Sequence, residues 1–151
     1  MQRAEKTIRV NAPTEKVYNY WRDFENFPQF MKHVESVRPV SGDDKLTHWK
    51  INGPLGTSVE FDAEMTQDVP NKSIGWNSRG GSMETSGVVT FQDVNDVTEI
   101  HVLMQWYDTP LGKVGEIASR LFQDPEKMLE EDLQRFKDIV EGRIGSGSRR
   151  S

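Results

Sequence analysis

The chain has 151 residues, a formal net charge of −5 and no cysteine. A chain of this length forms one domain with a substantial core, and the missing cysteines exclude disulfides, thiolate metal sites and a cysteine nucleophile. The acidic balance argues against binding to nucleic acid, which needs clustered Lys and Arg, and the short apolar runs argue against a membrane-spanning helix or a signal peptide, so a cytoplasmic protein is expected.

The N-terminal part of the sequence predicts a strand and two short helices. Residues 6–10 alternate polar and apolar side chains, as in a strand with one wet face. Pro13 then precedes a helix whose apolar residues recur at helical spacing, namely Val17, Tyr20, Trp21 and Phe24. Residues 26–28 interrupt this pattern, and residues 28–34 are expected to form a second short amphipathic helix.

From residue 37 to residue 107 the hydrophobic period changes to two. The alternating segments are 46–51, 59–65, 74–78, 88–91 and 98–107, and clusters of turn residues separate them, which predicts antiparallel strands. The face expected to be apolar carries Trp49, Ile51, Val59, Phe61, Ala63, Met65, Ile74, Trp76, Val89, Phe91, Ile100, Val102, Met104 and Trp106. The opposite face carries charged and polar residues, which suits water.

The C-terminal part predicts one long helix. Asp124 and Pro125 form a helix start, Gly142 ends the helix, and its apolar stripe is Leu129, Leu133, Phe136 and Val140. Residues 110–122 are expected to form either an ordinary packed helix or a mobile gate. Residues 143–151 are rich in Gly, Ser and Arg, so we expect a disordered tail after a folded domain of residues 1–142.

A sheet with one apolar face needs a cover wider than the single apolar stripe of this helix. The mismatch predicts a space between helix and sheet, which is the default place for a ligand. The large inward side chains either line such a cavity or simply fill the core. The candidate ligand-binding residues are Phe27, Phe30, Trp49, Phe61, Met65, Trp76, Ser78, Phe91, Met104, Trp106, Leu129, Leu133 and Phe136.

Several runs of sequence resemble the polyketide cyclase/dehydrase-like branch of the START or SRPBCC superfamily, which is close to the coenzyme Q-binding START-domain proteins. These runs are residues 21–31, 34–37, 74–78, 110–112, 133–137 and 140–141. The resemblance extends over about residues 4–142. It implies the helix-grip fold, an α+β fold in which a curved antiparallel sheet of about seven strands wraps around a long C-terminal helix, with two short helices after the first strand.

In START-like proteins the region that corresponds to residues 110–122 borders the ligand entrance. The resemblance therefore favours a gate in this segment. The same segment is a candidate for transient contact with a membrane surface.

No set of residues predicts catalysis or metal binding. The histidines, His33, His48 and His101, have no ligand spacing, so neither a metal nor another cofactor is expected. Alternation places His48 and the carboxylates of residues 59–65 on the wet face, where burial does not raise a carboxyl pKa. Ser78 should point inward and hydrogen-bond a ligand or a backbone group, because no base is placed to activate it.

The sequence therefore predicts a protein that binds or carries a hydrophobic small molecule, such as a lipid, an isoprenoid quinone or a polyketide-like aromatic, in an internal cavity. The alternative is a cyclase or dehydratase that folds a polyketide-like substrate in the same cavity. A third hypothesis is a scaffold whose cavity is filled and idle. The expected partner is the hydrophobic ligand, and the sequence assigns no particular oligomeric state.

Overall fold

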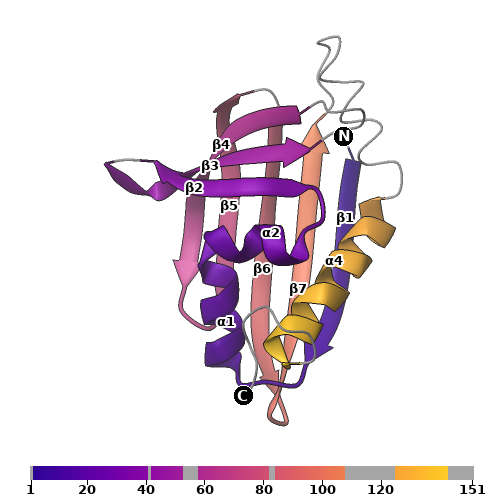
Figure 1. Ribbon diagram of the computed structural model, residues 1–151. Helices are drawn as coiled ribbons and strands as arrows, with labels where there is room; N and C mark the ends of the chain where they lie inside the picture. The colour runs from indigo at the N-terminus through magenta and orange to yellow at the C-terminus, as the bar shows by residue number, and fades with distance from the viewer. Residues whose placement is uncertain (1, 41, 53–57, 82–83, 108–124, 143–151) are drawn as a thin grey trace.

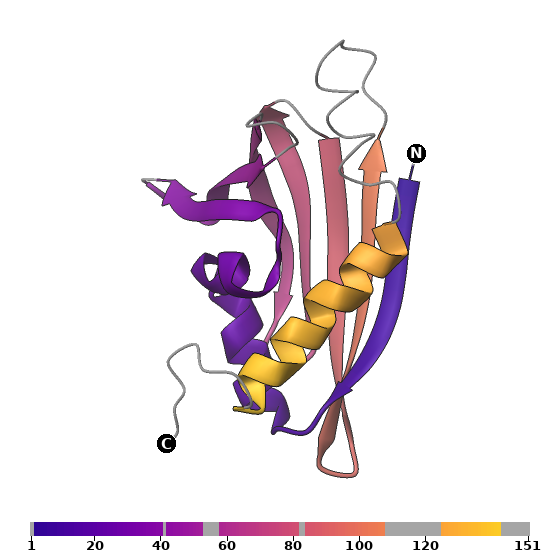
Figure 2. The same ribbon diagram turned by 45° about the vertical axis from the view of Figure 1, so that its right-hand side comes forward.

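One curved antiparallel sheet and one long helix dominate the computed structural model (Figures 1 and 2). The structure describes residues 2–40, 42–52, 58–81, 84–107 and 125–142. The seven strands within these residues are β1 (Gln2–Val10), β2 (Val34–Val40), β3 (Asp43–Asn52), β4 (Ser58–Val69), β5 (Ser73–Gly81), β6 (Glu84–Val94) and β7 (Val97–Tyr107). The helices are α1 (Thr14–Arg22), the 3-10 helix η1 (Phe24–Asn26), α2 (Phe27–Phe30) and α4 (Pro125–Val140). No helix in the described ranges is long and apolar enough to cross a membrane.

The strands lie antiparallel to their neighbours in the order β1-β7-β6-β5-β4-β3-β2. Between β6 and β7, Asn95 and Asp96 both have positive φ, 53° and 70°, as a two-residue type I′ turn requires. β1 pairs instead with β7, the last strand of the sheet in sequence, from Gln2 opposite Trp106 to Val10 opposite Thr98. The first strand of the chain is therefore held in the sheet by the last described strand of the chain.

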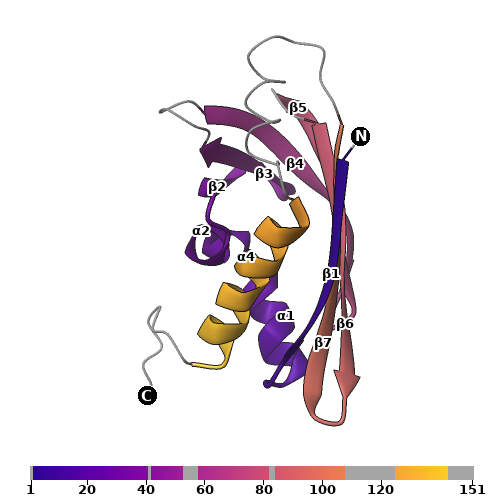
Figure 3. The ribbon, with the colours of Figure 1, turned by 90° about the vertical axis from the view of Figure 1, so that its right-hand side faces the viewer.

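The long helix α4 crosses the concave face of the sheet, while β2, β3 and β4 curl over it and over α2 (Figure 3). Its contacts with the sheet are concentrated on β1, and it also contacts α1 and α2. At its C-terminal end the Glu141 carboxylate accepts hydrogen bonds from the Asn11 amide (2.6 Å) and the Lys137 ammonium (2.7 Å). This arrangement confirms the predicted helix-grip fold.

The predicted division of the sheet into an apolar and a polar face is also confirmed. The residues expected on the apolar face are buried, except that Met65 and Met104 are half-buried and that the side chain of Trp106 lies outside the described part. One boundary differs from the prediction: Val34 begins β2 instead of ending the second short helix, because Met31 already has an extended backbone (φ −97°, ψ 107°). The segments 110–122 and 143–151 lie outside the described residues.

Aromatic side chains fill the space between α4 and the two early helices. The ring of Trp21, which is fully buried, has its centre 5.2 Å from that of Phe136, 5.4 Å from that of Phe27 and 5.5 Å from that of Phe30. Phe30 and Phe136 are 5.0 Å apart and meet edge to face, an arrangement that adds to the stability gained by burial alone. This aromatic cluster of Trp21, Phe27, Phe30 and Phe136 fixes the C-terminal half of α4.

Replacement of Phe136 by alanine tests the role of the aromatic cluster. Phe136 is fully buried between α4 and the early helices, so we expect F136A to lower the free energy of unfolding by about 3–5 kcal/mol. Gln134→Ala, on the exposed side of the same helix, should change it by less than about 0.5 kcal/mol. Urea unfolding of both variants measures the difference, and a similar small loss in both would contradict this role.

Candidate functional site

An apolar cavity lies between the N-terminal half of α4 and the sheet. Its volume is about 70 Å³. From α4 it is lined by Met128, Leu129 and Asp132, whereas Leu133 and Phe136, on the following turns, are buried in the core outside it. The lining residues are Phe27, Met31, His33, Val34, Trp49, Ile51, Phe61, Trp76, Thr85, Met104, Met128, Leu129 and Asp132.

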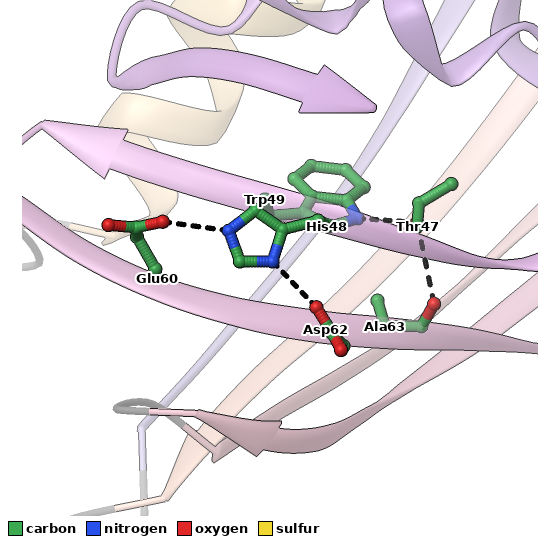
Figure 4. A network of polar contacts seen from close by, with 6 residues as sticks. All are labelled: Thr47, His48, Trp49, Glu60, Asp62 and Ala63. Carbon is green, nitrogen blue, oxygen red and sulfur yellow. Dashed lines mark hydrogen bonds and ion pairs between the residues drawn. The ribbon is translucent and has the colours of Figure 1, made fainter. Parts of the chain in front are cut away.

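Stacked aromatic rings form one wall of the cavity. The rings of Trp49 on β3 and Phe61 on β4 lie 5.9 Å apart at an interplanar angle of 11°, and Phe27 meets Trp49 edge to face at 5.1 Å. The indole N–H of Trp49 donates to the Thr47 hydroxyl (2.8 Å), as Figure 4 shows. Because its polar atom is bound in this way, Trp49 presents an apolar surface to the cavity.

A glycine determines where Trp76, another wall residue, can lie. Trp76, Gly87 and Met104 are paired across β5, β6 and β7, so Gly87 separates two lining residues. A Cβ atom on Gly87 would lie 2.8 Å from Cε2 and Cη2 of the Trp76 indole, and closer still to Cζ2. The indole therefore packs directly over the Gly87 backbone. Because glycine has no side chain, the Trp76 ring can lie at this place in the cavity wall.

Asp132 brings a carboxylate to this apolar space. Its Oδ1 accepts a hydrogen bond from the Lys32 amide (3.3 Å) and pairs with the Arg135 guanidinium, and the side chain is only 13% exposed. Burial raises the pKa of the Asp132 carboxyl to about 6, although the Lys32 amide and Arg135 act in the opposite direction. The group is therefore mainly ionised at neutral pH and becomes protonated in mild acid.

His33 and Thr85 are the other polar residues of the described lining. Burial lowers the pKa of His33, and the positive charges of Lys32 and Arg135 add to this effect, so its imidazole is neutral at pH 7. The Thr85 hydroxyl already donates to the Gln105 carbonyl (2.7 Å). Among the described residues none hydrogen-bonds the His33 imidazole, which leaves its ring nitrogens available to a ligand.

The structure distributes the predicted ligand-binding residues between the cavity and its surroundings. Those in the lining are Phe27, Trp49, Phe61, Trp76, Met104 and Leu129. Those buried in the core outside it are Phe30, Phe91, Leu133 and Phe136. Met65 is half-buried beside the core, the Ser78 hydroxyl accepts a hydrogen bond from the Thr85 amide (3.0 Å), and the Trp106 side chain is outside the described part. Ligand binding by any of these residues stays a prediction.

The lining also contains residues that sequence reasoning did not select as binding residues. They are Met31, His33, Val34, Ile51, Thr85, Met128 and Asp132. Asp132 is the most informative, because no inward acid was expected from the sequence. It lies three residues after Leu129 and next to Leu133, at the edge of the apolar stripe of α4. An acidic residue three or four positions from the apolar residues of a helix is the sequence signal for a carboxylate that points toward the cavity.

The polar face of the sheet carries a histidine between two carboxylates. His48 Nδ1 lies 2.6 Å from an Asp62 oxygen and Nε2 lies 2.7 Å from a Glu60 oxygen (Figure 4). The hydrogen bonds to Glu60 and Asp62 raise the pKa of His48, and the bond to His48 lowers the pKa of Glu60. In the described ranges no group of His, Asp or Glu side chains is placed to hold a metal ion. This cluster links β3 to β4 on the side away from the cavity.

The chain is similar in sequence to one described family and to a curated protein, and similar in structure to several solved proteins. Residues 10–124 match the family described as polyketide cyclase / dehydrase and lipid transport. An uncharacterized 17.2 kDa protein of Streptomyces lincolnensis is 37% identical over 145 residues, which cover 95% of this chain and 92% of that protein. A crystal structure from Deinococcus radiodurans is similar with a TM-score of 0.75 and 30% identity, covering 95% of this chain and 100% of the other. The Zhui aromatase/cyclase of Streptomyces sp. R1128 shares the fold, with a TM-score of 0.70 at 18% identity and coverage of 98% and 99%.

Gly87→Ala tests how the cavity wall is built. The added methyl group would overlap the Trp76 indole, so we expect the ring to shift and the free energy of unfolding to fall by about 1–3 kcal/mol. Ser86→Ala changes the neighbouring residue of β6, which faces the other side of the sheet, and should be nearly neutral. Urea unfolding compares the two variants, and equal stability of G87A and wild type would show that Trp76 does not need this space.

His48→Gln removes a contribution to stability that depends on pH. Since the pKa of His48 is raised above its ordinary 6.5, this contribution is complete below pH 6.5 and is lost as the pH rises through the folded-state pKa. The pKa of Glu60 is lowered from 4.5, so its contribution is present above pH 4.5 and is lost as the pH falls.

The difference in free energy of unfolding between wild type and H48Q should therefore be larger at about pH 5.5 than at about pH 8.5. Urea unfolding at both pH values measures it. A difference that is the same at both would show that His48 carries no additional charge interaction in the folded state.

Proposed function

Because the chain belongs to the polyketide cyclase/dehydrase and lipid transport family, we propose that it binds or carries a hydrophobic small molecule, such as a lipid, an isoprenoid quinone or a polyketide-like compound, in the cavity beneath α4. The observation that carries this proposal is the lining, in which aromatic, aliphatic and methionine side chains predominate. Removing the apolar surface of a ligand from water contributes roughly 25 cal/mol per Å² before the costs of ordering.

The cavity is smaller than these ligands. Ligand pockets usually span about 300–1,000 Å³, and even benzene occupies an engineered protein cavity of about 150 Å³, whereas this cavity measures about 70 Å³. Binding therefore requires the walls to move. Met31, Met104 and Met128 give the lining that freedom, because methionine side chains are unbranched and flexible. Met104 and Met128 are also only half-buried.

The opening movement belongs to the first turns of α4, residues 125–131, which precede Asp132 and its contacts with Lys32 and Arg135. The C-terminal half is fixed by the aromatic cluster and by the contacts of Glu141 with Asn11 and Lys137. In the N-terminal half, Met128 and Leu129 face the cavity, and their cavity sides have room that neighbouring side chains do not fill. A shift of these first turns enlarges the cavity without loss of the cluster.

A cyclase or dehydratase is the second candidate function, and Asp132 is the observation that favours it. General acid–base catalysis needs a titratable group beside the substrate with a pKa near the working pH. Asp132 lines the cavity, and burial raises the pKa of its carboxyl to about 6. A carrier returns its bound molecule unchanged, whereas an enzyme converts it, so mass spectrometry of the bound molecule over time distinguishes the two functions.

Binding of an uncharged fluorescent probe tests the proposed function. N-phenyl-1-naphthylamine emits more strongly when it leaves water for an apolar site, so we expect its emission to rise on titration with the protein. Met128→Trp should weaken binding at least tenfold, about 1.4 kcal/mol, because the larger side chain occupies the cavity. Direct excitation of the probe keeps the introduced indole from contributing to the signal.

Glu130→Trp is the matched control, because it adds the same indole to an exposed position of the same helix. Its affinity for the probe should equal that of the wild type. Absence of binding to the wild-type protein, or equal affinities of the two tryptophan variants, would overturn the proposed function.

A further inference from the structure

We propose that Asp132 and His33 form a recognition point in the cavity that selects apolar ligands carrying a hydroxyl group over ligands with an anionic head group. The inference rests on the proposed function, since it concerns which hydrophobic molecules the cavity accepts. It names the chemical class of the ligand, which neither the fold nor the comparisons provide.

The first observation is that one oxygen of Asp132 is still available. The contacts of this carboxylate, to the Lys32 amide and the Arg135 guanidinium, both use Oδ1. Among the described residues none contacts Oδ2. Asp132 lines the cavity, so Oδ2 is a carboxylate oxygen at this wall that can accept from a ligand without giving up a hydrogen bond to the protein.

The second observation is that the carboxylate is fixed in place. Arg135, which pairs with Oδ1, also donates from Nε to the Phe30 carbonyl at the end of α2 (3.0 Å). The Lys32 amide comes from the connection between α2 and β2. Rotation of Asp132 out of the cavity would break both of its contacts, so the acceptor is preorganised and loses little conformational freedom when a ligand binds.

The third observation is that two other polar groups of the wall already have partners. The Thr85 hydroxyl donates to the Gln105 carbonyl and the Trp49 indole N–H donates to Thr47. In the described lining, Oδ2 of Asp132, the His33 imidazole and the Trp76 indole N–H are the polar groups that no described residue hydrogen-bonds, and of these Asp132 and His33 supply the acceptors. Arg135 is not part of the lining, and its guanidinium is already bound to Asp132 Oδ1 and to the Phe30 carbonyl.

These groups match a hydroxyl better than the alternatives. A carboxylate can only accept a hydrogen bond, whereas the neutral imidazole of His33 has one donor and one acceptor nitrogen. A hydroxyl donates as well as accepts, so it can satisfy either group. An anionic head would face the Asp132 charge in an apolar surrounding, which is unfavourable. A ligand without a polar group would cover Oδ2 without offering it a hydrogen bond, which is also costly.

The test compares three probes that share one ring system: 1-naphthol, 1-methylnaphthalene and 1-naphthoate. Isothermal titration calorimetry at neutral pH should show that the wild-type protein binds 1-naphthol roughly tenfold more tightly than 1-methylnaphthalene and binds 1-naphthoate most weakly. In Asp132→Asn, which keeps the shape and the acceptor for Lys32, the preference for 1-naphthol should shrink and 1-naphthoate should bind as well as 1-methylnaphthalene.

Glu130→Gln is the control, because it removes one negative charge from an exposed position of α4 outside the lining. It should keep the wild-type order of affinities. The order measured on the wild-type protein tests the inference even if Asp132→Asn does not fold.

The outcomes separate this inference from the proposed function. Binding of N-phenyl-1-naphthylamine without any preference for 1-naphthol over the other two probes would overturn the inference and leave the proposed function standing. The same holds if Asp132→Asn keeps the wild-type order. If neither N-phenyl-1-naphthylamine nor any of the three probes binds, both fail.

Discussion

The packing of Phe136 against Trp21 and Phe30 is the interaction on which the rest of the structure depends. It attaches the C-terminal half of α4 to α1 and α2. The helix has 16 residues and is about 24 Å long in all. Its N-terminal half passes over the sheet and lines the cavity, which Phe27 of the cluster borders from the other side. This packing also has an unfavourable part. Nε1 of Trp21 is buried with no hydrogen-bond partner among the described residues, which destabilises the fold by about 1–3 kcal/mol.

This division of α4 combines stability with adaptability. The half that contains Phe136 is fixed by aromatic contacts and by the Glu141 hydrogen bonds. The half that contains Met128 and Leu129 borders empty space and a flexible lining. Gly87 completes the arrangement from the opposite side, because it lets the Trp76 indole lie against the sheet. A protein that must admit a guest needs such a separation, since movement of one wall then leaves the core intact.

Much of the fold follows from local patterns in the sequence, and the cavity does not. Alternation predicts which face of each strand is buried, and the stripe of α4 predicts its inner side. The pairing of β1 with β7 joins residues that are far apart in the sequence, so local alternation does not predict it. Only the family resemblance indicates that all the strands form one sheet. Leu129 and Leu133 have equivalent places in the stripe, yet of the two only Leu129 lines the cavity, a difference that the stripe itself does not encode. Asp132 was missed for a related reason: its burial depends on Lys32 and Arg135 closing around it.

The apolar space beneath the N-terminal half of α4 should be able to accept a guest molecule. Xenon enters dry apolar cavities in proteins without needing polar contacts, so a crystal structure determined under xenon pressure tests this claim most directly. We expect xenon to bind among Trp49, Phe61 and Leu129, which line the space. A well-ordered structure with no xenon at that place, and with the side chains closed upon one another, would contradict it.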